Sequence, residues 1–255
     1  MKSKNKRKGN IIRKIIFIIA LVVFIGSGYK LFTIWNEYHK NEVVYDEIKE
    51  KFGPEKVVDK GGEEKYKFTQ EDYDGLLAIN SDFKGWIYVP NTNVDYPIVQ
   101  SKDNDYYLHH NFYNEYNDGG AIFIASEIEN PFADKNTIIH GHHMNDGSMF
   151  ASLKEFKDSK EFFDKNRKIY ITTKDDVLVY EIFSVYYQVA NTDPYKYGFA
   201  SDEDYVNFLN GLKEKSLYSV DMEPFTKDDK IVTLSTCTYE VNDGRLLVHG
   251  RLIQN

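Results

Sequence analysis

Cys237 is the only cysteine in the 255-residue chain, and it ends the stretch IVTLSTC that begins at Ile231. The β-branched residues of this stretch predict a strand, on which alternate side chains share a face. Thr233, Ser235 and Cys237 then lie on one face, with the thiol at the strand end. A thiol at an exposed strand end can act as a nucleophile where neighbouring groups favour the thiolate, whereas a buried thiol is only a small apolar side chain. Cys237 alone fits both interpretations.

Histidines and an arginine elsewhere in the chain could supply what a nucleophilic thiol needs. His140, His142 and His143 follow the apolar stretch NTII, and Arg245 opens a later apolar stretch, eight residues after Cys237. A histidine can transfer protons near neutral pH, and an arginine provides a fixed positive charge. The three histidines could instead ligate zinc, with Cys237 as a distant ligand, or form an exposed polar turn. Arg245 could equally belong to a surface ion pair.

The charged residues are divided unevenly along the chain. Residues 1–30 carry eight Lys and Arg and no acidic residue, which leaves 24 basic against 40 acidic residues in the remainder. A body with a net charge near −16 lacks the basic face that a nucleic-acid-binding protein needs. The single cysteine also excludes an intrachain disulfide and a structural zinc site built on several cysteines.

The N-terminal region predicts a single membrane-spanning anchor. Residues 1–10 form a basic tail, and residues 11–35 are long enough to cross a bilayer if Arg13, Lys14 and Lys30 extend toward the interfaces. The positive-inside tendency places the tail in the cytoplasm, and the rest of the chain then lies outside the cell membrane. A cleaved signal peptide is the alternative, because a GSG sequence supplies small residues after the apolar run, although no A-x-A site is present.

Residues 36–68 predict a stalk and linker between this anchor and a folded domain. Their first part is polar and charged with scattered apolar residues, which indicates an exposed helix, and Pro54 and the Gly61–Gly62 pair then interrupt it. The folded domain is expected at residues 69–255, where Thr69 is placed to cap a short helix.

The folded domain predicts mostly β structure. Eight stretches rich in Val, Ile, Tyr, Phe and Thr are separated for the most part by turn residues, and helices are predicted around 148–156 and 201–217. Closure of eight strands into a barrel would leave no exposed strand edge. The stretches are GWIYV, VDYPIVQ, AIFIA, NTIIHGH, KIYITT, VLVYEIFSVYYQVA, KIVTLSTC and RLLVHGRLI.

Taken together, these motifs resemble those of the sortases, and of class B in particular. TLSTC at 233–237 is similar to the cysteine motif of the family, and Gly141–His142 sits where the family has a Gly-His pair. Arg245 heads the last strand, and the order His, Cys, Arg agrees as well. Residues 79–112 and the later of the two predicted helices are also similar to class B segments, so that the resemblance covers residues 70–253.

The resemblance implies a closed eight-stranded sortase-type β-barrel with a few peripheral helices, preceded by the transmembrane helix. It assigns Cys237 as the nucleophile, His142 as the histidine that transfers protons, and Arg245 as the catalytic arginine. It implies neither a metal ion nor a cofactor. The positions that line the substrate groove in the family correspond to Asn104, Leu108, Tyr195 and Ser235.

A sortase of Gram-positive bacteria is a cysteine transpeptidase that cleaves a C-terminal sorting motif of an exported protein through a thioester. It joins the acyl end to a cell-wall amine. The resemblance therefore implies two partners, exported proteins that carry the motif and an amine of a peptidoglycan precursor or cross-bridge.

Two alternatives remain. One is a membrane-anchored cysteine endopeptidase that releases its acyl-enzyme to water, and the other is a non-catalytic anchored binding domain with Cys237 buried. A papain-type protease is disfavoured, because there the cysteine precedes the histidine in the chain.

Overall fold

The second of two compact units holds the β structure and the residues with potential chemistry. The units are Met1–Glu42 and Val43–Asn255. The computed structural model describes residues 2–58, 64–189, 195–238 and 244–254.

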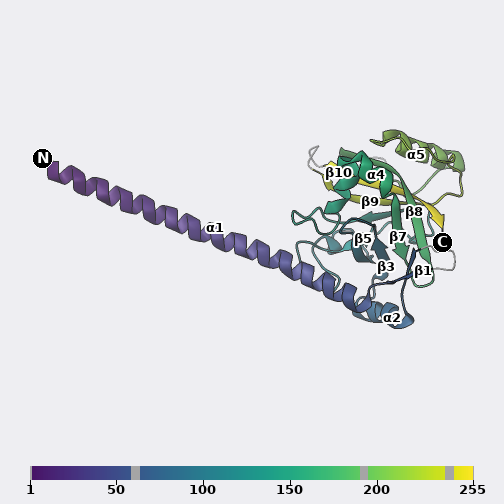
Figure 1. Ribbon diagram of the computed structural model, residues 1–255, viewed down its shortest axis with the longest axis horizontal. Helices are drawn as coiled ribbons and strands as arrows, with labels where there is room; N and C mark the ends of the chain where they lie inside the picture. The colour runs from purple at the N-terminus through teal and green to yellow at the C-terminus, as the bar shows by residue number, and fades with distance from the viewer. Residues whose placement is uncertain (1, 59–63, 190–194, 239–243, 255) are drawn as a thin grey trace. The chain divides into compact units, whose positions relative to one another are not determined.

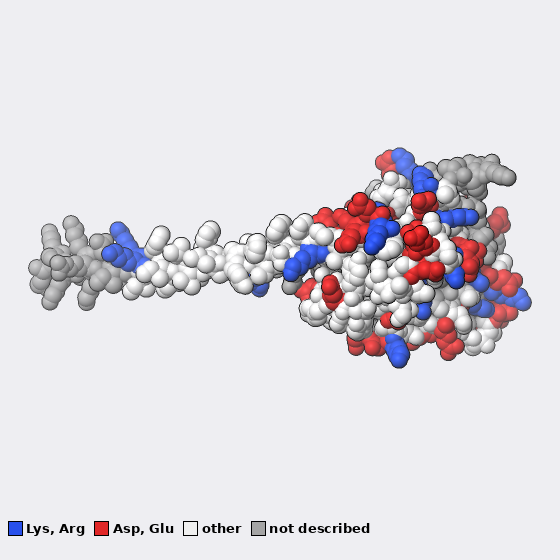
Figure 2. All heavy atoms as spheres, turned by 90° about the horizontal axis from the view of Figure 1, so that it is seen from below, with Lys and Arg blue, Asp and Glu red and all other residues white. Residues whose placement is uncertain are grey.

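Helix α1 spans Lys2–Phe52. Its portion from Arg13 onward is long and apolar enough to cross a membrane, with a mean hydropathy of 2.3 over 18 residues. The apolar side chains from Ile15 to Ile25 are exposed, as expected for a helix that contacts lipid. Figure 2 shows this stretch of the helix as a nearly uncharged surface. The expected helix at 11–35 is therefore present, and its place in a membrane stays a prediction.

Eight strands of the second unit close into a barrel (Figure 1). Their order is β10-β8-β7-β3-β4-β5-β6-β9, and pairing of β9 with β10 closes the ring. Neighbouring strands are antiparallel except for β4–β5 and β6–β9, which are parallel. The predicted closed barrel of eight strands is confirmed. The strands are β3 Phe83–Tyr88, β4 Asp95–Val99, β5 Ile122–Ile124, β6 Asn136–His140, β7 Lys168–Thr172, β8 Val177–Val189, β9 Ile231–Thr238 and β10 Gly244–Gln254.

Short helices surround the barrel, and α2, α4 and α5 each begin at a residue whose side chain caps the helix. In α2, Gln70–Ile79, the Thr69 hydroxyl accepts a hydrogen bond from the Asp72 backbone N–H at 3.1 Å, as the sequence predicts. Ser201 caps α5, Asp202–Lys215, in the same way, and the apolar side of α5 packs against residues of β8, β9 and β10. The remaining short helices are η1 Tyr106–Leu108, η2 Ala151–Lys154, α3 Glu155–Asp158 and α4 Lys160–Lys165.

The predicted stalk and linker at 36–68 carries more structure than its composition indicates. Tyr45 and Ile48, in the last turns of α1, are only 4% and 0% exposed. After Pro54, β1 (Glu55–Val58) pairs in antiparallel fashion with β2 (Glu64–Lys67). These contacts depend on the barrel surface, which a local sequence pattern does not contain. The compact unit thus begins at Val43, whereas an independently folding domain from residue 69 stays a prediction.

The register of β9 assembles the site. Arg245 of β10 lies directly opposite Cys237, and His140 of β6 lies directly opposite Ser235. Residues that oppose each other on neighbouring strands point to the same face of a sheet. Four polar side chains from three strands therefore share one face near the end of β9.

Candidate active site

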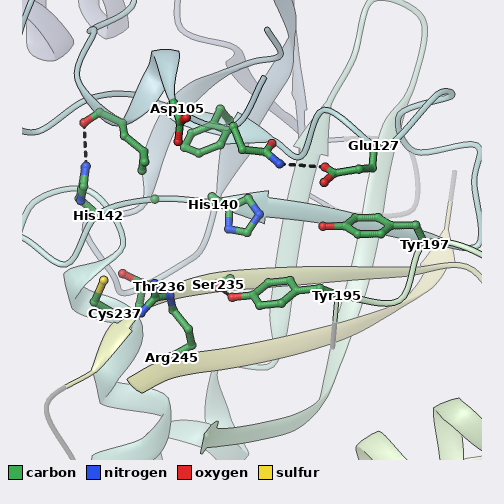
Figure 3. A pocket seen from close by; sticks show the side chains of 14 residues that line it. Asp105, Glu127, His140, His142, Tyr195, Tyr197, Ser235, Thr236, Cys237 and Arg245 are labelled. Carbon is green, nitrogen blue, oxygen red and sulfur yellow. Dashed lines mark hydrogen bonds between the residues drawn. The ribbon is translucent and has the colours of Figure 1, made fainter. Parts of the chain in front are cut away.

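A groove with a volume of about 680 Å³ opens over this face of the barrel. Its walls come from strand ends, from the segment around η1 and from the segment after β8, which lie far apart in the sequence (Figure 3). The structure brings all seven predicted site residues into this groove, namely Asn104, Leu108, His142, Tyr195, Ser235, Cys237 and Arg245.

Cys237 is partly exposed, and its sulfur points toward the side of the groove on which His142 lies (Figure 3). The alternative of a buried thiol does not describe this position. Arg245 lines the same part of the groove, and its Nη1 donates to the Gly244 carbonyl at 3.0 Å. A fixed cation beside a thiol can stabilise a thiolate and a developing oxyanion.

His142 is oriented by a backbone carbonyl. Its Nε2 lies 2.8 Å from the carbonyl oxygen of Leu108. A carbonyl oxygen only accepts hydrogen bonds, so Nε2 must carry a proton and donate it. In the neutral ring, Nδ1 is then the nitrogen that can accept a proton. Leu108 thus orients His142 through its backbone, in addition to lining the groove.

Gly141 allows His142 to lie close to the barrel. A Cβ at this position would be 2.5 Å from the Ile122 side chain and 2.8 Å from that of Phe150. The Gly141 N–H also donates to the Ser235 carbonyl at 3.1 Å. A larger residue would push the backbone of His142 away from its neighbours.

His143 binds the backbone of the candidate nucleophile. Its Nδ1 donates to the carbonyl oxygen of Cys237 at 2.9 Å. This hydrogen bond fixes the end of β9 without using the thiol. The His143 ring therefore holds the strand end, whereas the hydrogen bond of His142 uses Nε2 and leaves Nδ1 as its proton-accepting nitrogen.

His140 forms part of the groove wall. Its ring packs against Phe123 and Tyr195, with centroids 5.3 and 5.6 Å away. Burial lowers the pKa of His140 to about 4, because the opposing effect of Glu127 is smaller and the charge of Arg245 adds to the lowering. The ring is therefore neutral at physiological pH.

The zinc interpretation finds no geometric support in the part of the chain that the structure describes. There, no three His, Cys, Asp or Glu side chains lie together as ion ligands. His142 and His143 donate to two different backbone carbonyls, and His140 packs against aromatic rings.

Two of the predicted groove residues make side-chain hydrogen bonds there. The Tyr195 hydroxyl lies 2.8 Å from Ser235 Oγ, and burial raises the pKa of Tyr195, which keeps it neutral. Asn104 Nδ2 donates to Glu127 Oε2 at 2.9 Å (Figure 3). Burial acts to raise the pKa of Glu127, but hydrogen bonds, first among them that from Asn104, outweigh it and lower the pKa.

Several groove residues lie outside the motifs of the sequence, and two of them, Glu127 and Tyr197, lie at the end of the groove opposite Cys237 (Figure 3). Burial raises the pKa of Tyr197 to about 12, whereas Glu127 is a carboxylate. The groove therefore runs from the cation of Arg245 to an anion. No motif marks these loop residues, because their place depends on how the barrel folds. Asp105, Phe123 and Thr236 were missed as well, and His140 and Gly141, which the sequence singles out beside His142, also line the groove.

A family model described as the sortase domain matches residues 87–253. The chain belongs to the sortase family. Sortase B of Listeria monocytogenes is 35% identical to this sortase over 242 residues, which are 94% of this chain and 96% of that protein. Sortase B of Staphylococcus aureus is 30% identical over the same shares of the two chains.

Solved structures place this sortase in class B as well. Sortase B from Bacillus anthracis superimposes with a TM-score of 0.73 at 37% identity and covers 87% of this chain and 100% of that one. A sortase B–substrate complex from Staphylococcus aureus gives a TM-score of 0.73 at 28% identity, over 86% of this chain and 98% of that one. This class B sortase is an enzyme of the cysteine transpeptidase type.

Proposed function

We propose that this sortase cleaves a C-terminal sorting motif of exported proteins and transfers the acyl end to a cell-wall amine. The observation that supports it is the meeting of Cys237, His142 and Arg245 at one end of a long groove. No step of the reaction calls for a metal ion or a cofactor.

In the acylation step, the Cys237 thiol gives its proton to Nδ1 of His142, and the resulting thiolate attacks the carbonyl carbon of the scissile peptide bond. A C–S bond forms, and the negative charge moves to the carbonyl oxygen, near which Arg245 provides hydrogen-bond donors. The C–N bond then breaks as His142 gives its Nδ1 proton to the departing amine. The Leu108 carbonyl accepts the hydrogen bond from Nε2–H throughout. This hydrogen bond keeps the His142 ring in one orientation and stabilises the protonated, charged form of the ring.

In the transfer step, an amine attacks the thioester carbon. Nδ1 of His142 accepts the proton that the amine loses, and the C–S bond breaks to return the thiolate. The incoming amine belongs to a peptidoglycan precursor or cross-bridge. Asn104, Leu108, Tyr195 and Ser235 bind the motif along the groove, through apolar contact and through hydrogen bonds to its backbone.

The proposed location follows from the uneven charge and from the apolar portion of α1. Residues 11–35 anchor the protein by a single membrane pass, with the basic residues 1–10 in the cytoplasm and the catalytic domain outside the cell. Exported substrates emerge at that face of the membrane. The acidic domain has no role in binding nucleic acid.

The test is product analysis with the full chain in detergent. A panel of peptides with different sorting motifs is incubated with and without triglycine, and the products are identified by mass spectrometry. A transpeptidase gives the acyl fragment joined to triglycine. An endopeptidase gives only the free acid at any triglycine concentration, and a binding domain gives no product.

A further inference from the structure

Two buried tyrosines, Tyr45 of α1 and Tyr96 of β4, form a pair that does not line the groove. They are 4% and 8% exposed, and their rings meet edge to face with centroids 5.2 Å apart. Burial raises the pKa of Tyr96 to about 12 and raises that of Tyr45 as well, so both hydroxyls are neutral. Buried hydroxyls of this kind need hydrogen-bond partners, and here the partners are backbone groups.

Tyr45 supports the carbonyl that orients the His142 ring. Its hydroxyl donates to the Gly120 carbonyl at 2.8 Å. Gly120 has φ +57°, and a Cβ there would lie 2.3 Å from the Tyr107 carbonyl oxygen and 2.9 Å from that of Leu108. The backbone at Gly120 therefore packs directly against the Leu108 carbonyl, which accepts from His142 Nε2 at 2.8 Å.

Tyr96 supports the backbone of the same histidine. Its hydroxyl accepts from the Met149 N–H at 3.0 Å. Met149 forms a β-bridge with His143, and the next residue, Phe150, donates its N–H to the His142 carbonyl at 3.0 Å. The tyrosine pair thus holds both the segment that orients the ring and the segment that pairs with the backbone.

We propose that Tyr45 and Tyr96 are positioning residues that fix His142 in its Nε2–H tautomer with Nδ1 available for proton transfer. This inference rests on the proposed role of His142. Small displacements of a group that transfers protons slow a reaction strongly, even when the displaced contact lies outside the substrate site. The last turns of α1 then belong to the catalytic apparatus and do not serve only as a stalk.

A purely structural role for the pair is the alternative, and Tyr205 provides the matched control. Tyr205 of α5 is 0% exposed, and its hydroxyl oxygen lies 2.8 Å from the carbonyl oxygens of both Lys135 and Asp229, to either of which it can donate. It does not line the groove. Tyr205→Phe therefore removes buried hydroxyl contacts of the same kind without touching the support of His142.

The experiment uses the full chain in detergent, as wild type and as Tyr45→Phe, Tyr96→Phe and Tyr205→Phe. The kcat and KM are measured for a cleaved peptide with triglycine, and the His142 ring is followed by ¹⁵N NMR, with its signals assigned through a His142→Gln variant. For Tyr45→Phe and Tyr96→Phe we expect kcat to fall roughly tenfold with KM changed less than about twofold. The ring signals should move toward a mixture of tautomers. Tyr205→Phe should lower the melting temperature only.

Unchanged kcat and unchanged His142 signals in Tyr45→Phe and Tyr96→Phe would overturn the inference. A fall in kcat for Tyr205→Phe equal to that of Tyr45→Phe would do the same, because stability would then explain the effect. If one tyrosine variant does not fold, the other decides. If the wild type processes no peptide of the panel, the proposed function fails, and the NMR signals still decide whether the pair controls the ring.

Discussion

At the scale of single residues, His142 and His143 differ in the backbone carbonyl to which each imidazole ring donates a hydrogen bond. His142 donates to the Leu108 carbonyl through Nε2, which leaves Nδ1 for the proposed proton transfer, whereas His143 donates to the carbonyl of Cys237 itself. Substitution of the two neighbouring histidines should therefore have different effects, on activity for His142 and on stability for His143. Loss of the first removes a proton carrier, and loss of the second loosens a strand end.

We expect His142→Ala to lower the rate of transpeptidation about 1000-fold, because both proton transfers lose their carrier. His143→Ala should cost only a hydrogen bond, about 1 kcal/mol of stability, and retain most of the activity. His140→Ala should retain most of it too. Initial rates on one peptide, with and without a chelator, separate these effects. Equal losses in all three variants together with inactivation by the chelator would favour the zinc interpretation instead.

A buried histidine outside the groove predicts how stability depends on pH. His249 is 0% exposed, and its ring stacks on Tyr186 with centroids 5.4 Å apart. Thr233 Oγ1 donates to Asn136 Oδ1, so it must accept from Nδ1 of His249 at 3.0 Å. Burial, aided by the charge of Lys215, lowers the pKa of His249 to about 3. The folded protein thus keeps this ring neutral well below the pH at which the unfolded chain protonates it.

Between about pH 6.5 and pH 3, the unfolded chain binds a proton at His249 that the folded chain does not, so stability falls as the pH falls. At about pH 4.5 the loss from this residue should be about 2 to 3 kcal/mol relative to pH 7. His249→Asn keeps a donor for Thr233 and removes the titration. Urea unfolding at both pH values should therefore show a smaller pH dependence in the variant. The same pH dependence in both proteins would contradict the neutral buried ring.

The sequence predicted the site residues better than their partners. Cys237, His142 and Arg245 stand in motifs, and all three line the groove. The groups that orient them are backbone carbonyls, such as those of Leu108 and Cys237, and a carbonyl carries no sequence signal. The anion of Glu127 was missed for a related reason, since its loop reaches the groove only after the barrel closes.

At the scale of elements, all eight barrel strands were predictable because each is a β-rich stretch, most of them bounded by turn residues. The short strands β1 and β2 were not predictable from the sequence. Each has only four residues, too few for a clear alternation of apolar and polar side chains, and one face of the pair is covered only by the barrel. The buried end of α1 was missed for the same reason. Tyr45 and Ile48 are two apolar side chains in a charged helix, and only tertiary packing shows that they are covered.

We expect a fragment beginning at residue 69 to fold cooperatively, because the eight strands form a closed set. It should be less stable than a fragment beginning at Val43 by about 3 kcal/mol, since it lacks the burial of Tyr45 and Ile48. Thermal melts of the two fragments measure the difference. Equal stability would show that the end of α1 contributes little, and aggregation of the shorter fragment would move the domain boundary toward Val43.

At the scale of the whole molecule, the two units differ in surface chemistry. The first carries the basic tail of residues 1–10 and the apolar stretch, and acidic side chains are spread among basic and uncharged ones over the visible face of the second (Figure 2). An acidic domain is repelled by an anionic membrane surface and so does not itself bind it. We therefore expect attachment to the membrane to depend on α1.

We expect the protein to remain in the membrane fraction after alkaline extraction, because a spanning helix is held by its apolar length and not by charge. Protease added outside intact protoplasts should remove the catalytic domain and leave the tail of residues 1–10 intact. A cleaved signal peptide predicts a different outcome. The catalytic domain would then appear in the medium, with an N-terminus that begins soon after the GSG sequence.

The most direct test of the central claim is the mass of the enzyme during turnover. The full chain is mixed with a cleavable sorting-motif peptide in the absence of an amine, quenched in acid, and analysed by mass spectrometry with mapping of the modified residue. Our account predicts a covalent adduct of the acyl fragment on Cys237 that disappears when triglycine is added, with formation of the triglycine conjugate. Product formation by Cys237→Ala, or conjugate formation by the wild type with no adduct on Cys237 at any time, would contradict it.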